Sequence, residues 1–128
     1  MPTAITHHIK VSVESMYQPL YSDPKAGKFV HAYLVSIENL SAEVVQLIDR
    51  HWVIWDANNV TKEVKGDGVV GQQPIIDPGQ THQYQSWCPL TTTIGKMSGQ
   101  FGMIRVSDGH TFTIDIPEFK LIVPFKQN

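Results

Sequence analysis

The sequence has a single cysteine, no basic run and no long apolar stretch. Cys88 alone forms no disulfide within one chain, as expected for a reducing compartment. The ten Lys and Arg residues are scattered among twelve Asp and Glu residues, so we expect no broad surface for nucleic acid or for an anionic membrane. No apolar stretch approaches the roughly 20 residues that span a bilayer. The first residues lack a basic segment followed by an apolar run, so we also expect no signal peptide and predict a cytoplasmic protein.

The sequence also lacks helical periodicity. Instead, apolar and polar residues alternate as they do in β-strands. The 128 residues are 41% hydrophobic and 17% charged, which is enough to bury a core in one domain spanning residues 1–128. Residues 9–14 and 29–38 each alternate between two sets of side chains, which predicts two strands. Between them, the polar segment 21–28 contains Pro and Gly and is expected to be a loop.

The longest apolar run, residues 44–56, predicts a strand that is apolar on both faces. One predicted face carries Val45, Leu47, Val53 and Trp55, and the other carries Ile48, Trp52 and Ile54. A strand of this kind is usually central in its sheet or covered by another element. Asn58-Asn59 predicts a hairpin turn, after which residues 60–64 would pair back with the run.

The second half of the chain repeats short strands and turns. Asp77-Pro78-Gly79 predicts a turn, residues 82–86 a short strand, and Asp108-Gly109 a hairpin between strands 99–106 and 110–116. Pro117 predicts a break before a last strand at 118–123. About seven or eight strands without a convincing helix predict an all-β fold, an antiparallel β-sandwich.

Six motifs, in this order and separation, resemble the ApaG family over nearly the whole chain. They are Arg50-His51-Trp52, the segment from Gly66 to Pro74, Asp77-Pro78-Gly79, Tyr84-Gln85-Ser86, the segment from Leu90 to Gly99, and Ile116-Pro117-Glu118-Phe119. Trp87-Cys88 departs from the small residues expected after Ser86. The resemblance implies a fibronectin type III-like sandwich of immunoglobulin-type architecture. In bacteria the family is linked to cobalt and magnesium resistance and to diadenosine tetraphosphate metabolism, and related eukaryotic domains are usually viewed as protein-interaction modules.

Gly66, Gly68 and Gly71 match the G-x-G-x-x-G pattern that lets backbone amides approach a pyrophosphate. The prolines at 74 and 78 argue against the helix that a dinucleotide site needs after this pattern. Two interpretations stay open: a tight loop that needs positive φ, and a weak phosphate or pyrophosphate site. The candidate anion-binding residues are Lys65, Gly66, Asp67, Gly68 and Gly71, with Arg50 approaching across the sheet.

Trp52 and Trp55 lie three positions apart in one predicted strand, so they should point to opposite faces. If one fills the core, the other faces outward, where a tryptophan is a suitable anchor for a partner unless a loop covers it. The candidate partner-binding surface is therefore Arg50, His51, Trp52 and Trp55.

No cofactor or catalytic site is predicted, and a divalent-metal binder is only a third, weaker interpretation, which would need a cross-strand cluster of histidines with Asp49 or Asp56. The histidines have no zinc-site spacing, and His7-His8 would point to opposite faces of a strand; the six are His7, His8, His31, His51, His82 and His110. Cys88 precedes a proline and has no activating motif, so we expect a small, partly buried residue there rather than a nucleophile.

The sequence therefore predicts a non-enzymatic interaction domain whose protein partner it does not identify. The alternative is a binder of small anions or nucleotide phosphates, acting through the glycine loop in diadenosine tetraphosphate metabolism. An exposed sheet edge would also permit two copies to pair, so a homodimer is a further expectation.

Overall fold

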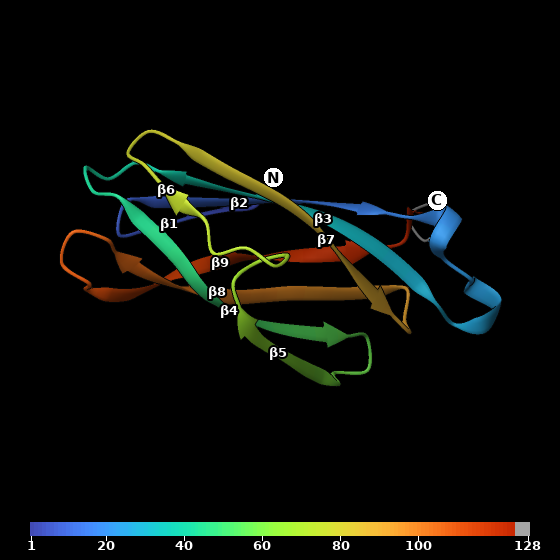
Figure 1. The fold of residues 1–128 in the computed structure, drawn as a ribbon. Coiled ribbons are helices and arrows are strands. Elements are labelled where there is room, and N and C mark those ends of the chain that lie inside the picture. Colours follow the sequence, from blue (N-terminus) through green and yellow to red (C-terminus); the bar gives the residue numbers. More distant parts are fainter. Residues whose placement is uncertain (125–128) are drawn as a thin grey trace.

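Two antiparallel sheets pack face to face in the computed structural model, which describes residues 1–124 (Figure 1). The first sheet has the order β1-β2-β3-β7, with β1 at Thr3–Thr6, β2 at Ile9–Tyr17, β3 at Phe29–Asn39 and β7 at Thr81–Leu90. The second has the order β5-β4-β8-β9, with β4 at Val45–Asp56, β5 at Thr61–Asp67, β8 at Ile94–Arg105 and β9 at Thr111–Ile122, and the short β6, Ile75–Ile76, also pairs with β4.

The predicted all-β sandwich is confirmed. Within residues 1–124 the only helical segments are two 3-10 turns, at Pro19–Tyr21 and Pro24–Ala26, and no helix is long and apolar enough to cross a bilayer. The last four residues of the predicted 1–128 domain lie outside the described part of the chain.

The core lies between the sheets because inward positions alternate along each strand. On β2, Ile9, Val11 and Val13 are fully buried, as the alternation predicts. The largest core side chain is Trp52, whose ring packs edge-on against Tyr33, Phe101 and Phe119 at centroid distances of 5.4–6.3 Å. Burying an aliphatic or aromatic side chain of this size stabilises a fold by about 1.5–3 kcal/mol.

β4 is central, as predicted, with β5 and β6 on one side and β8 on the other. The two predicted faces of this strand were wrong. Val45 and Leu47 face the core, but the pairing with β8 shifts between Leu47 and Asp49, so the extra residue Ile48 exchanges the faces beyond it. Trp52 is therefore buried on the same side as Val45, while Trp55 points outward.

Other boundaries differ from the predictions. β7 and β8 begin or end several residues beyond the predicted strands. β9 runs through Pro117 without a break, because the pairing with β8 shifts there and leaves Pro117 outside the regular ladder. β1 was not predicted, and His7-His8 form the turn after it with φ of 50° and 63° instead of lying within a strand.

The two long sides of the sandwich differ. On one side the first two strands meet β9, where Ser15 Oγ donates to the Lys120 carbonyl at 3.1 Å and the Asp115 amide donates to Thr6 Oγ1 at 3.1 Å. On the other side β5 and β7 are edge strands, each paired with one neighbour only. The second side is consequently open between the sheets.

Candidate functional site

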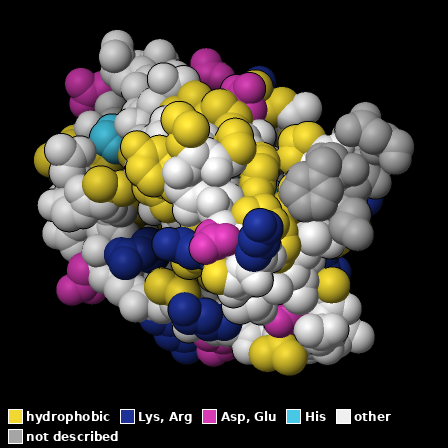
Figure 2. Space-filling model, turned by 90° about the vertical axis from the view of Figure 1, so that its right-hand side faces the viewer, with side chains coloured by type: hydrophobic (Ala, Val, Ile, Leu, Met, Phe, Trp, Pro, Cys, Tyr) yellow, Lys and Arg dark blue, Asp and Glu magenta, His cyan; other side chains and the backbone are white. Residues whose placement is uncertain are grey.

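A groove of about 420 Å³ lies between the edge strands β5 and β7. Its lining comes from both sheets and from the adjoining turns: Tyr33, Arg50, Trp52, Ile54, Asp56, Val60, Lys62, Val64, Ser86, Trp87, Cys88, Pro89, Leu90, Thr91 and Met97. Figure 2 shows the end of the molecule that carries the β4–β5 and β7–β8 hairpins, where basic side chains gather beside a band of hydrophobic ones. The groove thus combines an apolar floor with basic groups.

Strand alternation explains which residues line the groove. Beyond the bulge, Arg50, Trp52 and Ile54 lie on the inward face of β4, and Lys62 and Val64 lie opposite on β5. From the other sheet, β7 contributes its inward residues Ser86, Cys88 and Leu90. Trp52 forms part of the floor, where it is only 2% exposed.

Arg50 is held in the groove by neutral backbone groups. Its Nη1 donates to the carbonyl oxygens of Asp67 at 3.0 Å and of Gly68 at 2.9 Å. A Cβ at position 66 would lie 2.9 Å from the same nitrogen, so Gly66 leaves the space that the guanidinium occupies. The absence of a side chain at Gly66 therefore makes room for the Arg50 guanidinium. Gly66 lies within β5 rather than in a loop.

The segment after Gly66 forms a small two-residue hairpin. Val69 and Gln72 pair through both backbone hydrogen bonds, at 2.8 and 3.0 Å, and the central residues Val70 and Gly71 have φ of 48° and 75°, as in a type I′ turn. The Gly68 amide donates to the carbonyl of Ile48 at 2.8 Å, which ties this segment to the β4 bulge.

This geometry gives little support to the predicted anion site. Three amides of the segment donate to carbonyl groups of the protein, and two of its carbonyl oxygens point at Arg50. The following residues contain the short strand β6 in place of the helix that would complete a dinucleotide-binding site. Lys65 and Asp67 line a second, shallow hollow, which shares Arg50 with the groove and also includes Asp49, His51 and Gly66.

Two tyrosine hydroxyls lie near Arg50 inside the sandwich. Burial raises the pKa of Tyr33, and contact with Ser86 and the charge of Arg50 offset part of that rise. Burial also raises the pKa of Tyr84, again against the charge of Arg50, and within residues 1–124 its hydroxyl is buried without a hydrogen-bond partner. Both groups are neutral donors at physiological pH.

Cys88 is buried in the wall of the groove, 2% exposed, as the sequence predicts for a small structural residue. Burial raises the pKa of its thiol to about 11, and the opposing charge of Lys62 offsets only part of the rise. The thiol is therefore protonated at neutral pH and is a poor nucleophile. Opposite Cys88 in the β3–β7 pairing lies His31, which is 1% exposed and has a pKa lowered by burial.

The structure divides the predicted partner surface. Arg50 and Trp52 line the groove, whereas His51 and Trp55 lie on the opposite, outward face of β4. There His51 lies 3.6 Å from Glu63, and the Nζ atom of Lys96 lies 4.9 Å from the centroid of the Trp55 ring. Lys96 thus lies over the Trp55 ring.

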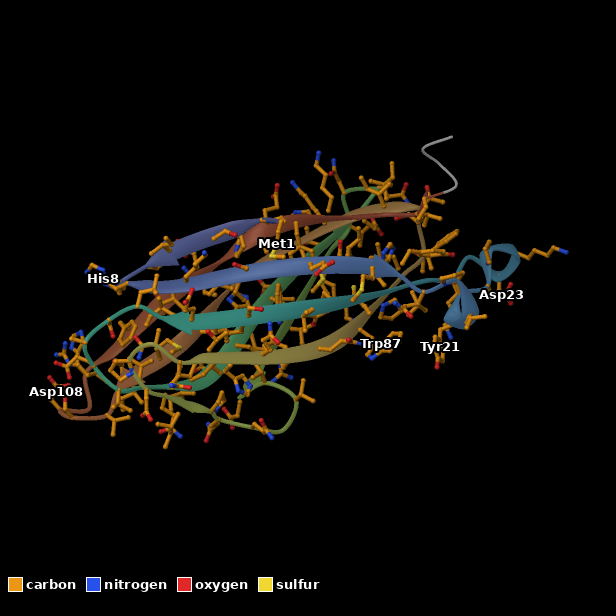
Figure 3. The ribbon with its side chains drawn as sticks, turned by 90° about the horizontal axis from the view of Figure 1, so that it is seen from above. Met1, His8, Tyr21, Asp23, Trp87 and Asp108 are labelled. Atoms are coloured by element: carbon orange, nitrogen blue, oxygen red, sulfur yellow. The ribbon has the colours of Figure 1, made fainter. Side chains whose placement is uncertain are left out.

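Some groove residues were missed by sequence reasoning. Tyr33, Lys62 and Leu90 come from three different strands, and only the register between strands brings them together. Trp87 was noted only as a departure from the family pattern. It is 45% exposed and its ring packs edge-on against Tyr21 at 5.2 Å, at the end of the first sheet (Figure 3).

A second hollow lies at the other end of β4, around the β1–β2 and β8–β9 turns; Figure 3 labels His8 and Asp108 at this end. Its lining is His7, His8, Leu40, Ser41, Ala42, Glu43, Val45, Arg105, His110 and Phe112. Arg105 donates to both carboxylate oxygens of Asp108, at 2.9 and 2.6 Å. Within residues 1–124 no three His, Cys, Asp or Glu side chains gather as a metal ion would require.

Comparison with known proteins agrees with the motifs. The family model described as the ApaG domain matches residues 19–105. Protein ApaG of Brucella canis is 48% identical over 124 residues, covering 97% of this chain and 95% of that protein, and Protein ApaG of Brucella anthropi is 47% identical with the same coverage. The crystal structure of the putative ApaA protein of Bordetella pertussis has a TM-score of 0.87 and 42% identity, covering 96% of both chains. The chain belongs to the ApaG domain family.

Proposed function

We propose that this protein is a cytoplasmic, non-enzymatic interaction domain that binds an extended segment of a partner protein in the groove between β5 and β7. The observation that carries the proposal is the groove itself, which is open along two edge strands and floored by apolar side chains. Edge strands offer unpaired backbone groups to a peptide, and pockets beside them accept alternate side chains.

The chemistry of the groove supports binding rather than catalysis. Its thiol is protonated at neutral pH, and the pKa values of Tyr33 and Tyr84 are raised, so these hydroxyls are not bases near neutrality. Apolar side chains that remain accessible in the groove, namely Val60, Trp87 and the partly buried Ile54, provide the contact that anchors a partner.

The test is selection of peptides from a random library displayed on phage, followed by titration of an enriched synthetic peptide into isotopically labelled protein. We expect the largest amide shifts along Thr61–Asp67 and Thr81–Leu90. Shifts confined to another surface, or the failure of any sequence to enrich over an unrelated domain, would contradict the proposal.

A matched pair of variants sharpens this test. Val60 at the groove mouth is 62% exposed and Val106 at the far end is 49% exposed, so Val60→Gln and Val106→Gln remove comparable apolar surface with little effect on stability. We expect only Val60→Gln to weaken the enriched peptide, by roughly fivefold, which corresponds to about 1 kcal/mol. Equal affinities for the two variants would place the binding surface elsewhere.

A further inference from the structure

We infer that the groove selects an acidic partner segment, one with carboxylate side chains that face Arg50 and Lys62 and apolar side chains that face the β7 wall. This inference rests on the proposed function and specifies the chemistry of the ligand. It follows from the balance of charge in the groove.

The two cations of the groove lack carboxylate partners. Within residues 1–124 neither Arg50 nor Lys62 takes part in an ion pair, whereas Lys96 is paired with Glu118 and Arg105 with Asp108. The carbonyl groups that bind Arg50 satisfy two of its N–H groups and fix its orientation, but they do not neutralise its charge.

The one acidic residue that lines the groove is used elsewhere. Oδ1 of Asp56 accepts hydrogen bonds from the amides of Asn58 at 2.8 Å and Val60 at 3.1 Å, which closes the β4–β5 turn. This carboxylate stabilises the turn from the end of the groove. The groove lining therefore carries two cations against one carboxylate, which lies at its end.

Arg50 on β4 and Lys62 on β5 both line the groove, so both positive charges face a ligand bound there. Lys62 is close enough to Cys88, across the groove on β7, for its charge to oppose the rise in that thiol's pKa. Nη1 of Arg50 is occupied, and within the described residues Nε and Nη2 donate to no protein acceptor. A half-buried guanidinium with free donors is suited to bind a carboxylate by charge-assisted hydrogen bonds.

An extended peptide matches this arrangement in period. Its side chains alternate between two directions, so acidic residues at alternate positions would meet Arg50 and Lys62, while the intervening apolar residues would face the opposite wall, where β7 contributes Cys88 and Leu90. Charges of this kind add selectivity and association rate, and the apolar contacts add affinity.

The probes are three fluorescent ten-residue peptide pools with mixed apolar residues at odd positions and Glu, Lys or Gln at even positions. Fluorescence anisotropy with the wild-type protein should show at least about tenfold tighter apparent binding of the Glu pool than of the Gln pool, and weaker binding of the Lys pool than of either. The preference should shrink as salt is raised, since ionic screening weakens exposed charge pairs.

Two charge reversals on β5 give the matched control. Lys62→Glu and Lys65→Glu alter exposed residues of the same strand, but only Lys62 lines the groove. We expect Lys62→Glu to abolish the preference for the Glu pool and Lys65→Glu to change it less than twofold. Neither variant removes a hydrogen bond of the fold, so both should remain folded.

The outcomes separate the two proposals. Equal binding of all three pools would overturn the acidic specificity and leave the interaction function standing, while no binding of any pool, with no peptide enriched from the library, would overturn both. Inorganic pyrophosphate is the last probe: if it binds, loses affinity in Lys62→Glu and no pool binds, the groove is a small-anion site and the peptide proposal is wrong. Equal loss in Lys62→Glu and Lys65→Glu would overturn the assignment to the groove.

Discussion

The two arginines of this chain serve opposite ends of β4 in different ways. In the hollow at the start of the strand, Arg105 makes two hydrogen bonds to the carboxylate of Asp108, three residues along the same turn. In the groove toward the end of the strand, Arg50 is held by the carbonyl oxygens of Asp67 and Gly68, which carry no net charge.

The difference separates a charge used in a local turn from a charge available to a ligand. The side chains of Arg105 and Asp108 are 37% and 51% exposed, and an exposed pair of this kind contributes little to stability. Arg50 is half buried, and the protein has arranged Gly66 and the following hairpin around it without supplying a carboxylate. Arg50 therefore both stabilises the groove end and keeps a positive charge that a ligand can bind. Arg105 in the hollow is already paired with a carboxylate.

The largest expected difference in stability is between truncation of Trp52, beneath the groove, and truncation of Phe112, at the hollow. Trp52→Ala should lower the free energy of unfolding by about 3–5 kcal/mol, because it empties the centre of the core. Phe112→Ala at the hollow, where the ring is only partly buried, should cost about 1 kcal/mol. Urea denaturation followed by circular dichroism measures both, and equal losses would show that the groove floor is no better packed than the hollow.

Sequence alone predicted much of this fold. The alternation in residues 9–14 and 29–38, the hairpin turns at Asn58-Asn59 and Asp108-Gly109, and the two-sided apolar character of residues 44–56 reflect local chemistry, and the corresponding strands are present. The faces of β4 were not predictable in this way, since one extra residue at Ile48 reverses the alternation and only the pairing with β8 reveals it.

The groove was less predictable than the strands. Arg50 and Trp52 were identified because they belong to a motif, but the same reasoning grouped them with His51 and Trp55, which face the other way. Gly66 was named as a candidate anion-binding residue, with a tight loop as the other interpretation, because its pattern matched G-x-G-x-x-G. A glycine is needed at this position because the Arg50 guanidinium, from the neighbouring strand, occupies the space of a Cβ. The residues next to Gly66 in the sequence do not reveal this contact.

The second contrast removes each arginine in turn. Arg50→Met removes the donor of the carbonyl groups of Asp67 and Gly68, one exposed and one partly buried, so we expect a loss of about 1 kcal/mol in the free energy of unfolding. Arg105→Met removes only an exposed pair and should leave the denaturation midpoint at the wild-type value within error. If the two variants lose stability equally, Arg50 has no special structural role in the groove.

The smallest effect is a difference in pH dependence between the two ends. Burial lowers the pKa of His31, next to the groove wall, and also that of His82, so below pH 6.5 the unfolded chain binds protons that the folded protein does not. Stability should therefore fall as the pH drops below about 6.5, the ordinary pKa of histidine. At the hollow, hydrogen bonds from Arg105 and from the His110 amide lower the pKa of Asp108 to about 2, so its contribution is complete above the usual pKa of 3.8 and is lost only between there and about 2.

Two variants assign the two pH windows. His31→Phe keeps an aromatic ring against Tyr17 and removes a buried nitrogen that has no partner within residues 1–124, so it should be at least as stable as wild type at pH 7 and should lose less stability between pH 6.5 and 5. The slope that remains in this window belongs partly to His82. Asp108→Asn should be less stable than wild type by a small amount that stays constant above pH 4, and the difference should shrink as the pH falls below it. Urea midpoints measured from pH 7 to pH 3 distinguish these curves. If His31→Phe loses as much stability as wild type between pH 6.5 and 5, His31 does not cause the loss of stability in acid. If the pH dependence of Asp108→Asn differs from that of wild type near pH 6, the loss arises at the hollow instead.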